Sequence, residues 1–85
     1  MMVVAPARAD APADPSRHRD EARALAEQGL ERLDAGDPRA AISLLDQAEA
    51  KFHAPTHLLY LARAHAQLGE HVAAATLYAQ LVNET

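Results

Sequence analysis

The sequence contains no cysteine and no tryptophan, and aromatic residues make up only 4% of its 85 positions. Without cysteine the chain forms no disulfide, offers no thiolate nucleophile and supplies no sulfur ligand to zinc. A β-sandwich or barrel of this length would need more aromatic and β-branched residues. An all-α fold is therefore predicted, and the length allows one small domain.

Basic residues and long apolar runs are also scarce. Eight Lys and Arg stand against twelve Asp and Glu, which gives a net charge of −4. Nucleic acid is not an expected partner, because a protein that binds a phosphate backbone needs a basic face. No apolar run approaches the ~18 residues that cross a bilayer, so no membrane span is expected.

Residues 1–15 contain three prolines and no helical periodicity, which predicts a disordered tail. Two interpretations of this segment stay open. It is an Ala- and Pro-rich tail of a cytoplasmic protein, or it is the end of a signal peptide whose start codon lies upstream. The second rests on apolar Met1–Ala5 and on Ala7-Arg8-Ala9, which fits the small-x-small rule of a cleavage site. It would make the protein periplasmic or otherwise exported.

Four helices are predicted after residue 14, from helix-starting Asp-Pro or Ala-Pro pairs and helix-ending glycines. The first runs from Asp14-Pro15 to Gly36, the second starts at Asp37-Pro38, the third runs from Ala54-Pro55 to Gly69 and the fourth covers about 71–83. Short loops make consecutive helices antiparallel. The residues predicted to face inward share a helical spacing: Ala22, Leu25, Ala26, Gly29, Leu30, Leu33; Ala41, Leu44, Leu45, Ala48, Phe52; Leu58, Leu61, Ala62, His65, Leu68; Ala74, Leu77, Tyr78 and Leu81.

The two helical hairpins repeat each other at an offset of 33 residues. Seven positions correspond: Leu25, Gly29, Gly36, Asp37, Ala41, Leu45 and Ala48 recur as Leu58, Ala62, Gly69, Glu70, Ala74, Tyr78 and Leu81. A fixed period of this length is typical of solenoid proteins, in which each hairpin buries its apolar face against the next.

These positions resemble the tetratricopeptide repeat, a motif with small residues where helices approach closely, Gly-Asp at the turn and an aromatic later in the second helix. The resemblance implies two repeats, 16–53 and 54–85, stacked as a short right-handed solenoid. A narrower likeness, over Phe52–Ala62, is to the repeat region near the start of exported bacterial tetratricopeptide proteins. It leaves open that this chain is a fragment of such a protein.

No residue pattern indicates catalysis or metal binding. Five histidines are present, but His53 and His57 are separated by Pro55, which predicts that they lie on different elements. The pairs Asp46 with Glu49 and Glu27 with Glu31 are interpreted as solvated faces of helices. We therefore expect a non-enzyme without a metal or other cofactor, with solvated or loop histidines and with His65 partly buried.

The resemblance implies a protein-interaction scaffold that binds a peptide or helix on its concave surface, which the first helix of each hairpin lines. The residues expected to contact such a ligand are Arg23, Leu30, Leu33, Leu59, Arg63 and Gln67. Arg23 and Arg63 would reach a carboxylate.

The partner is alternatively a second copy of the chain. Two repeats leave one side of the last hairpin open, and an exposed apolar face there would suit a homo-oligomer. The residues expected on that face are Val72, Leu77, Leu81 and Val82.

Overall fold

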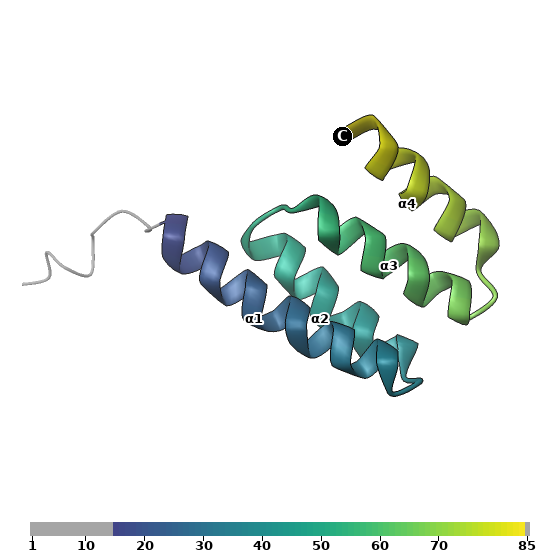
Figure 1. Ribbon diagram of the computed structural model, residues 1–85, viewed down its shortest axis with the longest axis horizontal. Coiled ribbons are helices and arrows are strands. Elements are labelled where there is room, and N and C mark those ends of the chain that lie inside the picture. Colours follow the sequence, from purple (N-terminus) through teal and green to yellow (C-terminus); the bar gives the residue numbers. More distant parts are fainter. Residues whose placement is uncertain (1–14, 85) are drawn as a thin grey trace, which may run out of the picture.

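The computed structural model describes residues 15–84, which form four α-helices joined by three short connections. Their bounds are α1 Pro15–Asp34, α2 Pro38–Lys51, α3 Pro55–Gln67 and α4 His71–Glu84. They form two hairpins, α1–α2 and α3–α4, that stack side by side (Figure 1). The predicted all-α architecture of two helical hairpins is confirmed. The predictions made for residues 1–14 lie outside the described residues.

The helix ends follow the chemistry of their residues. The Asp37 carboxylate accepts a hydrogen bond from the Ala40 N–H (3.3 Å) and so caps the start of α2. Gly36 and Gly69 adopt φ values of +81° and +79°, which an L side chain rarely tolerates. At each glycine the chain reverses within three residues, and the following helix is set antiparallel.

The core lies between the first hairpin and α3. Three side chains of α2, Ala41, Leu45 and Ala48, are fully buried because α1 covers one side of this helix and α3 covers another. Gly29 of α1 allows the closest approach, since a Cβ there would lie 2.9 Å from Cγ of Leu45. The small residue predicted at this position is therefore required by packing.

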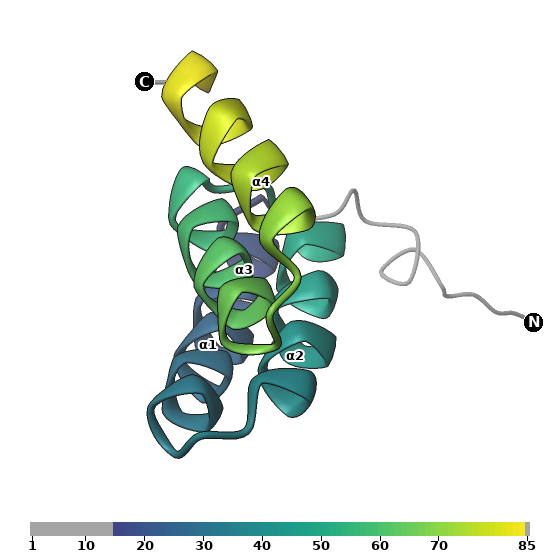
Figure 2. The same ribbon diagram turned by 90° about the vertical axis from the view of Figure 1, so that its right-hand side faces the viewer.

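Helix α4 forms the outer edge of the described structure. Among the described helices it packs against α3 alone, and Ala74 is its one buried residue. Figure 2 shows α3 lying between α4 and the first hairpin. Tyr78, predicted to face inward, is 39% exposed because, among the described helices, α3 alone packs against α4.

None of the helices in residues 15–84 combines the length and the apolar character that crossing a bilayer requires.

Candidate functional site

A groove of about 340 Å³ lies between α1, the start of α3 and the connection that joins α2 to α3. Its α1 side is formed by Ala22, Ala26 and Leu30, which are spaced so that all three face the same way. The alanines are buried and short, so they leave a hollow where longer side chains would fill the space. The groove is thus apolar at its base.

Two aromatic residues form the opposite wall of this groove. Phe52 ends α2 in an extended conformation, and Tyr60 comes from the second turn of α3. Phe52 was predicted to face the core but is 36% exposed, because the chain leaves helical geometry at this residue. The guanidinium of Arg19 lies 5.4 Å from the centre of the Phe52 ring, within the range of a cation–π contact.

Charged side chains line the rim. Arg19, Arg23 and Glu27 all project from α1 and border the groove. Arg23 is exposed, and no carboxylate among the described residues pairs with it. Its five guanidinium donors are therefore available to a ligand, whereas those of an arginine held in an ion pair are partly used.

The structure places the predicted groove residues in three different settings. Arg23 and Leu30 line the groove. Leu33 does not, and its prediction as a ligand contact is wrong: it is 1% exposed and belongs to the core cluster formed with α2. Because Leu33 lies one turn beyond Leu30 along α1, at the end nearer the turn, it is covered by the partner helix.

The three predicted residues of α3 do not line this groove. Leu59 is partly buried, while Arg63 and Gln67 are exposed further along the helix. Arg63 has partners within the molecule, because its guanidinium lies 5.9 Å from the centre of the Tyr60 ring and 4.0 Å from a carboxylate oxygen of Asp34. Of the two arginines expected to reach a carboxylate, Arg23 is the one at the groove.

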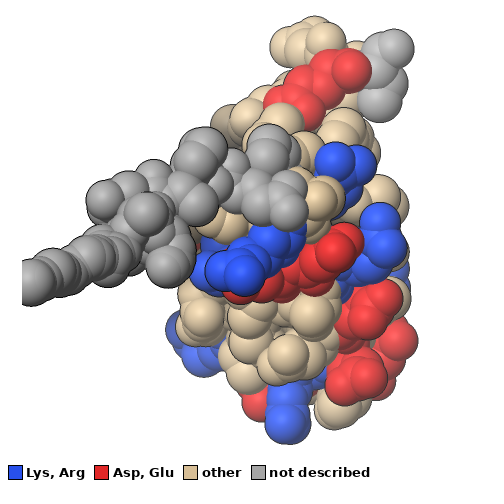
Figure 3. Space-filling view, turned by 90° about the vertical axis from the view of Figure 1, so that its left-hand side faces the viewer, with Lys and Arg blue, Asp and Glu red and all other residues tan. Residues whose placement is uncertain are grey.

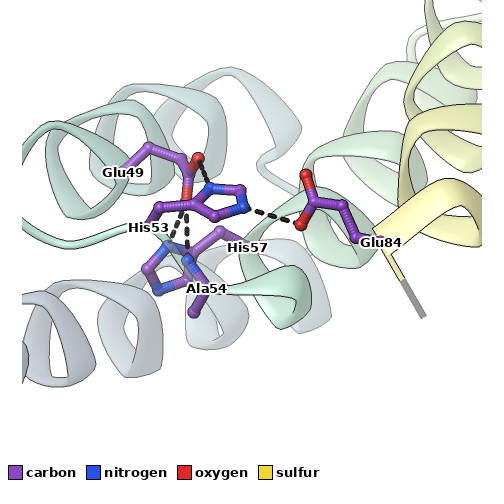
Figure 4. A network of polar contacts seen from close by, with 5 residues as sticks. All are labelled: Glu49, His53, Ala54, His57 and Glu84. Carbon is purple, nitrogen blue, oxygen red and sulfur yellow. Dashed lines mark hydrogen bonds and ion pairs between the residues drawn. The ribbon is translucent and has the colours of Figure 1, made fainter.

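A hydrogen-bond network stands directly behind the wall of the groove (Figure 4). Glu49, in the last turn of α2, accepts three hydrogen bonds through its carboxylate. Oε1 accepts from the Ala54 N–H (3.1 Å) and from Nδ1 of His57 (2.7 Å), and Oε2 accepts from Nδ1 of His53 (2.5 Å). His53 extends the network, because its Nε2 lies 2.6 Å from Oε1 of Glu84 at the end of α4.

This arrangement shifts two titrations. Partial burial acts to raise the pKa of Glu49, but hydrogen bonds from His53, from the Ala54 N–H and from His57 outweigh it and hold the pKa below its usual value. The pKa of His53 is raised, first by its hydrogen bond to Glu49 and second by that to Glu84. The two shifts together widen the pH range over which an ionised Glu49 carboxylate pairs with a His53 imidazolium.

Sequence reasoning missed this network. Glu49 was interpreted as part of a solvated face but is partly buried. His57 was expected to be solvated or in a loop but lies in α3 and is 3% exposed. His53 and His57 do lie on different elements, as Pro55 indicated, yet both contact the same carboxylate. One signal was available: Glu49 and His53 are four residues apart, the spacing at which side chains on a helix meet.

A second histidine pair resembles the first in chemistry but stays within one hairpin. Nδ1 of His65 lies 2.6 Å from Oε1 of Glu70, which closes the turn between α3 and α4. His65 is partly buried, as expected. Within residues 15–84, no group of three His, Asp or Glu side chains has an arrangement that would hold a metal ion.

The residues expected on an oligomer face divide into two pairs. Val72 and Val82 are 83% and 69% exposed. Leu77 and Leu81 are partly buried, and Leu77 packs against the core cluster, so its assignment to an open face is wrong. The open apolar surface of α4 is therefore the side opposite Leu77.

Charge is mixed over the face that looks along α1. In Figure 3, Lys and Arg side chains and Asp and Glu side chains share this face, with uncoloured (tan) residues of other types between them. The coloured part of this view shows no broad area of one sign. Such a surface suits recognition of a ligand through individual ion pairs rather than through the long-range attraction of a large patch of one charge sign.

Two helical hairpins that repeat each other in sequence and stack in parallel define a helical-repeat protein. The sequence model of the family described as tetratricopeptide repeat matches residues 26–84, more than half of the chain. The chain belongs to the tetratricopeptide repeat family. Searches of curated proteins and of solved structures returned no match. Repeats of this family generally mediate protein–protein interaction.

Proposed function

We propose that this chain is a non-catalytic interaction module that binds a peptide or a short helix in the groove between α1 and the start of α3. One observation carries the proposal: an apolar base formed by Ala22, Ala26 and Leu30 lies beside Arg23, which has no carboxylate partner among the described residues. Apolar side chains of a ligand would fill the base, and a ligand carboxylate would pair with Arg23.

The size of the groove sets the scale of the ligand. A volume of about 340 Å³ is at the lower end of the range for ligand pockets, so it holds two or three apolar side chains. The ligand is therefore expected to be a segment with a few anchoring residues, bound weakly unless further contacts are made outside the groove.

The test starts from peptides selected on the full-length chain from a displayed random library. The tightest peptide is synthesised with a fluorescent label, and its Kd is measured by anisotropy. Arg23→Ala is expected to weaken binding about five- to tenfold, the effect of losing an exposed charge-assisted hydrogen bond. Leu30→Asp is expected to abolish binding, because it places an unpaired charge against the apolar base.

Arg39→Ala is the matched control. Arg39 is an exposed arginine on α2, away from the groove, and no carboxylate among residues 15–84 pairs with it. It removes the same charge and should leave Kd unchanged. A peptide whose Kd responds equally to Arg23→Ala and Arg39→Ala would contradict the groove assignment. It would also be contradicted if every selected peptide bound the unmodified chain and the Leu30→Asp variant equally well.

A second candidate function is self-association through α4. Two observations favour it: Val72 and Val82 are exposed on the outer side of this helix, and residues 72–83 carry no charged side chain. Uncharged exposed helix surface is typical of interfaces. Light scattering of the full chain at several concentrations tests it. A dimer that Val72→Asp converts to a monomer supports this function, and a monomer at every concentration excludes it.

A further inference from the structure

The ring of His53 lies between carboxylates that come from two different helices. Its Nδ1 is 2.5 Å from Oε2 of Glu49 on α2, and its Nε2 is 2.6 Å from Oε1 of Glu84 on α4 (Figure 4). Glu49 and Glu84 are 35 positions apart in the sequence, so this ring joins segments that are distant along the chain.

The geometry fixes the protonation state of the ring. An ionised carboxylate can only accept hydrogen bonds, so both ring nitrogens must carry a proton to bond both partners. A neutral imidazole has one N–H and would turn a lone pair toward the other carboxylate. The bridge therefore exists in full only while His53 is an imidazolium.

Loss of a proton from His53 would affect its contacts with Glu49 and Glu84 differently. Glu49 keeps its hydrogen bonds from the Ala54 N–H and from His57 when His53 loses a proton. Among the described residues, the Glu84 carboxylate has His53 as its hydrogen-bond partner. The Glu49 contact joins residues four positions apart and its carboxylate is held in place by two other donors, whereas the Glu84 contact joins residues 31 positions apart, so the contact that reaches α4 is the one expected to open.

The packing of α4 is one-sided among the described helices. This helix packs against α3 alone among them, and Asn83 and Glu84 in its last turn are exposed. The contact from His53 to Glu84 links this turn to the connection between the hairpins. Its loss would remove a contact that ties the last turn of α4 to the first hairpin.

We propose that His53 is a proton-operated latch, which in its doubly protonated form ties the last turn of α4 to the corner between the two hairpins and releases it on losing one proton. The charged groups facing the ring are Glu49 from α2 and Glu84 from α4, and α3 contributes His57, which shares Glu49. Glu49 first and Glu84 second raise the pKa of His53 above its usual value, so the latch is closed on the acid side of that raised pKa and opens on its alkaline side.

The latch also touches the groove. Ala54 and His57, which Glu49 holds in place, line that groove, so the same carboxylate serves both features. The release concerns α4, however, and it is tested without any ligand. The latch and the proposed peptide binding therefore stand or fall separately.

The first measurement uses the unmodified full-length chain. The ring protons of His53 are titrated by NMR, and amide exchange is followed along α4 over the same pH range, with each rate corrected for its intrinsic pH dependence. Protection of residues 81–84, relative to the first two turns of α4, is expected to fall about two- to fivefold as His53 loses its proton, the range for a partly exposed ion pair. Unchanged relative protection across the titration overturns the latch.

Variants identify the contact responsible. Glu84→Gln removes the charge with little change in size, so it should lower the pKa of His53 and remove the pH dependence of protection at residues 81–84. Glu70→Gln is the matched control, because it removes the carboxylate from the His65–Glu70 pair, which lies within one hairpin. The control should change neither quantity. A pKa of His53 that is unaffected by Glu84→Gln, or equal effects of the two variants, would refute the proposal.

Discussion

Leu45 of α2 and Tyr78 of α4 hold the same position of the repeat, yet Leu45 is fully buried and Tyr78 is 39% exposed. The next corresponding pair behaves in the same way, since Ala48 is fully buried and Leu81 is only partly so. Ala41 and Ala74, by contrast, are buried in both hairpins because they face the partner helix of their own hairpin. The motif sets which side of a helix is apolar, and the neighbouring hairpin decides how much of it is buried.

This difference between the hairpins has one structural cause. Helix α2 lies between α1 and α3, whereas α4 packs against α3 alone among the described helices. The first hairpin therefore carries most of the core, and the second presents an edge. Solenoid proteins are stabilised by such nearest-neighbour contacts, so the two hairpins should respond differently to the same substitution.

The largest change in the free energy of unfolding is expected at the pair Leu45 and Tyr78, when the buried side chain of Leu45 is shortened. Leu45→Ala removes a fully buried side chain and should lower the free energy of unfolding by about 2–5 kcal/mol. Tyr78→Ala removes a half-exposed ring and should cost about 1 kcal/mol, in line with an average substitution. Urea unfolding followed by circular dichroism measures both. Equal losses would show that α4 is as well covered as α2.

A smaller change in stability is expected for Gly29→Ala, and its sign should depend on the side chain at position 45. The added Cβ of Gly29→Ala would lie 2.9 Å from Cγ of Leu45, and the strain should exceed the helix-forming gain of alanine, for a net loss of about 1 kcal/mol. In a Leu45→Ala background the space is free, so the same change should stabilise by about 0.5–1 kcal/mol. The four variants form a double-mutant cycle, and simple additivity would contradict this packing.

The pH dependence should be smaller again and should come from the network that joins the two hairpins. The raised pKa of His53 means that its contribution is full below its unfolded value of 6.5 and is lost as pH rises through the folded value. The lowered pKa of Glu49 means that its contribution is full above 4.5 and is lost as pH falls through the folded value. Stability is thus greatest between these limits.

The size of this pH effect is limited by exposure, because His53 is about half-exposed to solvent. We expect a change of less than about 1 kcal/mol on the alkaline side. Thermal unfolding of the unmodified chain and of Glu84→Gln over a pH series measures it. The variant should lose most of the decrease in thermal stability that occurs as pH rises. An unchanged decrease would show that a group other than the His53–Glu84 pair causes it.

The smallest effect is expected on the outer surface of α4. Val72 is 83% exposed, so Val72→Ser should change the free energy of unfolding by no more than about 0.5 kcal/mol. This substitution therefore distinguishes an α4 surface that is open to solvent from one that is covered by another molecule. A loss comparable to that of a core substitution, seen in the same urea experiment, would mean that α4 is covered in solution.

Periodicity and helix-ending residues were enough to predict the four helices, because Asp37, Pro38, Gly36 and Gly69 act through local backbone chemistry. The repeat also predicted the need for a small residue at Gly29. Burial in α4 was harder to predict, since Leu77 and Tyr78 were both expected to face inward but differ in what lies beside them.

The site was predicted only in part. The resemblance to the tetratricopeptide repeat placed Arg23, Leu30 and Leu33 on the concave side of the first helix, and Arg23 and Leu30 do line the groove. Leu33 was misplaced, since a position in the family's motif does not give the depth to which a neighbouring helix covers the residue. The groove wall and the network behind it depend on where the chain leaves α2 at Phe52 and on long-range contacts such as that of Glu84, which no local pattern contains.

The contrast between a covered α2 and an open α4 is tested most directly by native-state hydrogen exchange along the full-length chain at low protein concentration. Amides of α2 are predicted to exchange only through global unfolding, with the highest protection in the molecule, and amides of α4 to exchange faster through local opening. Equal protection of α2 and α4 under these conditions would contradict the account, because it would require α4 to be covered on a second side.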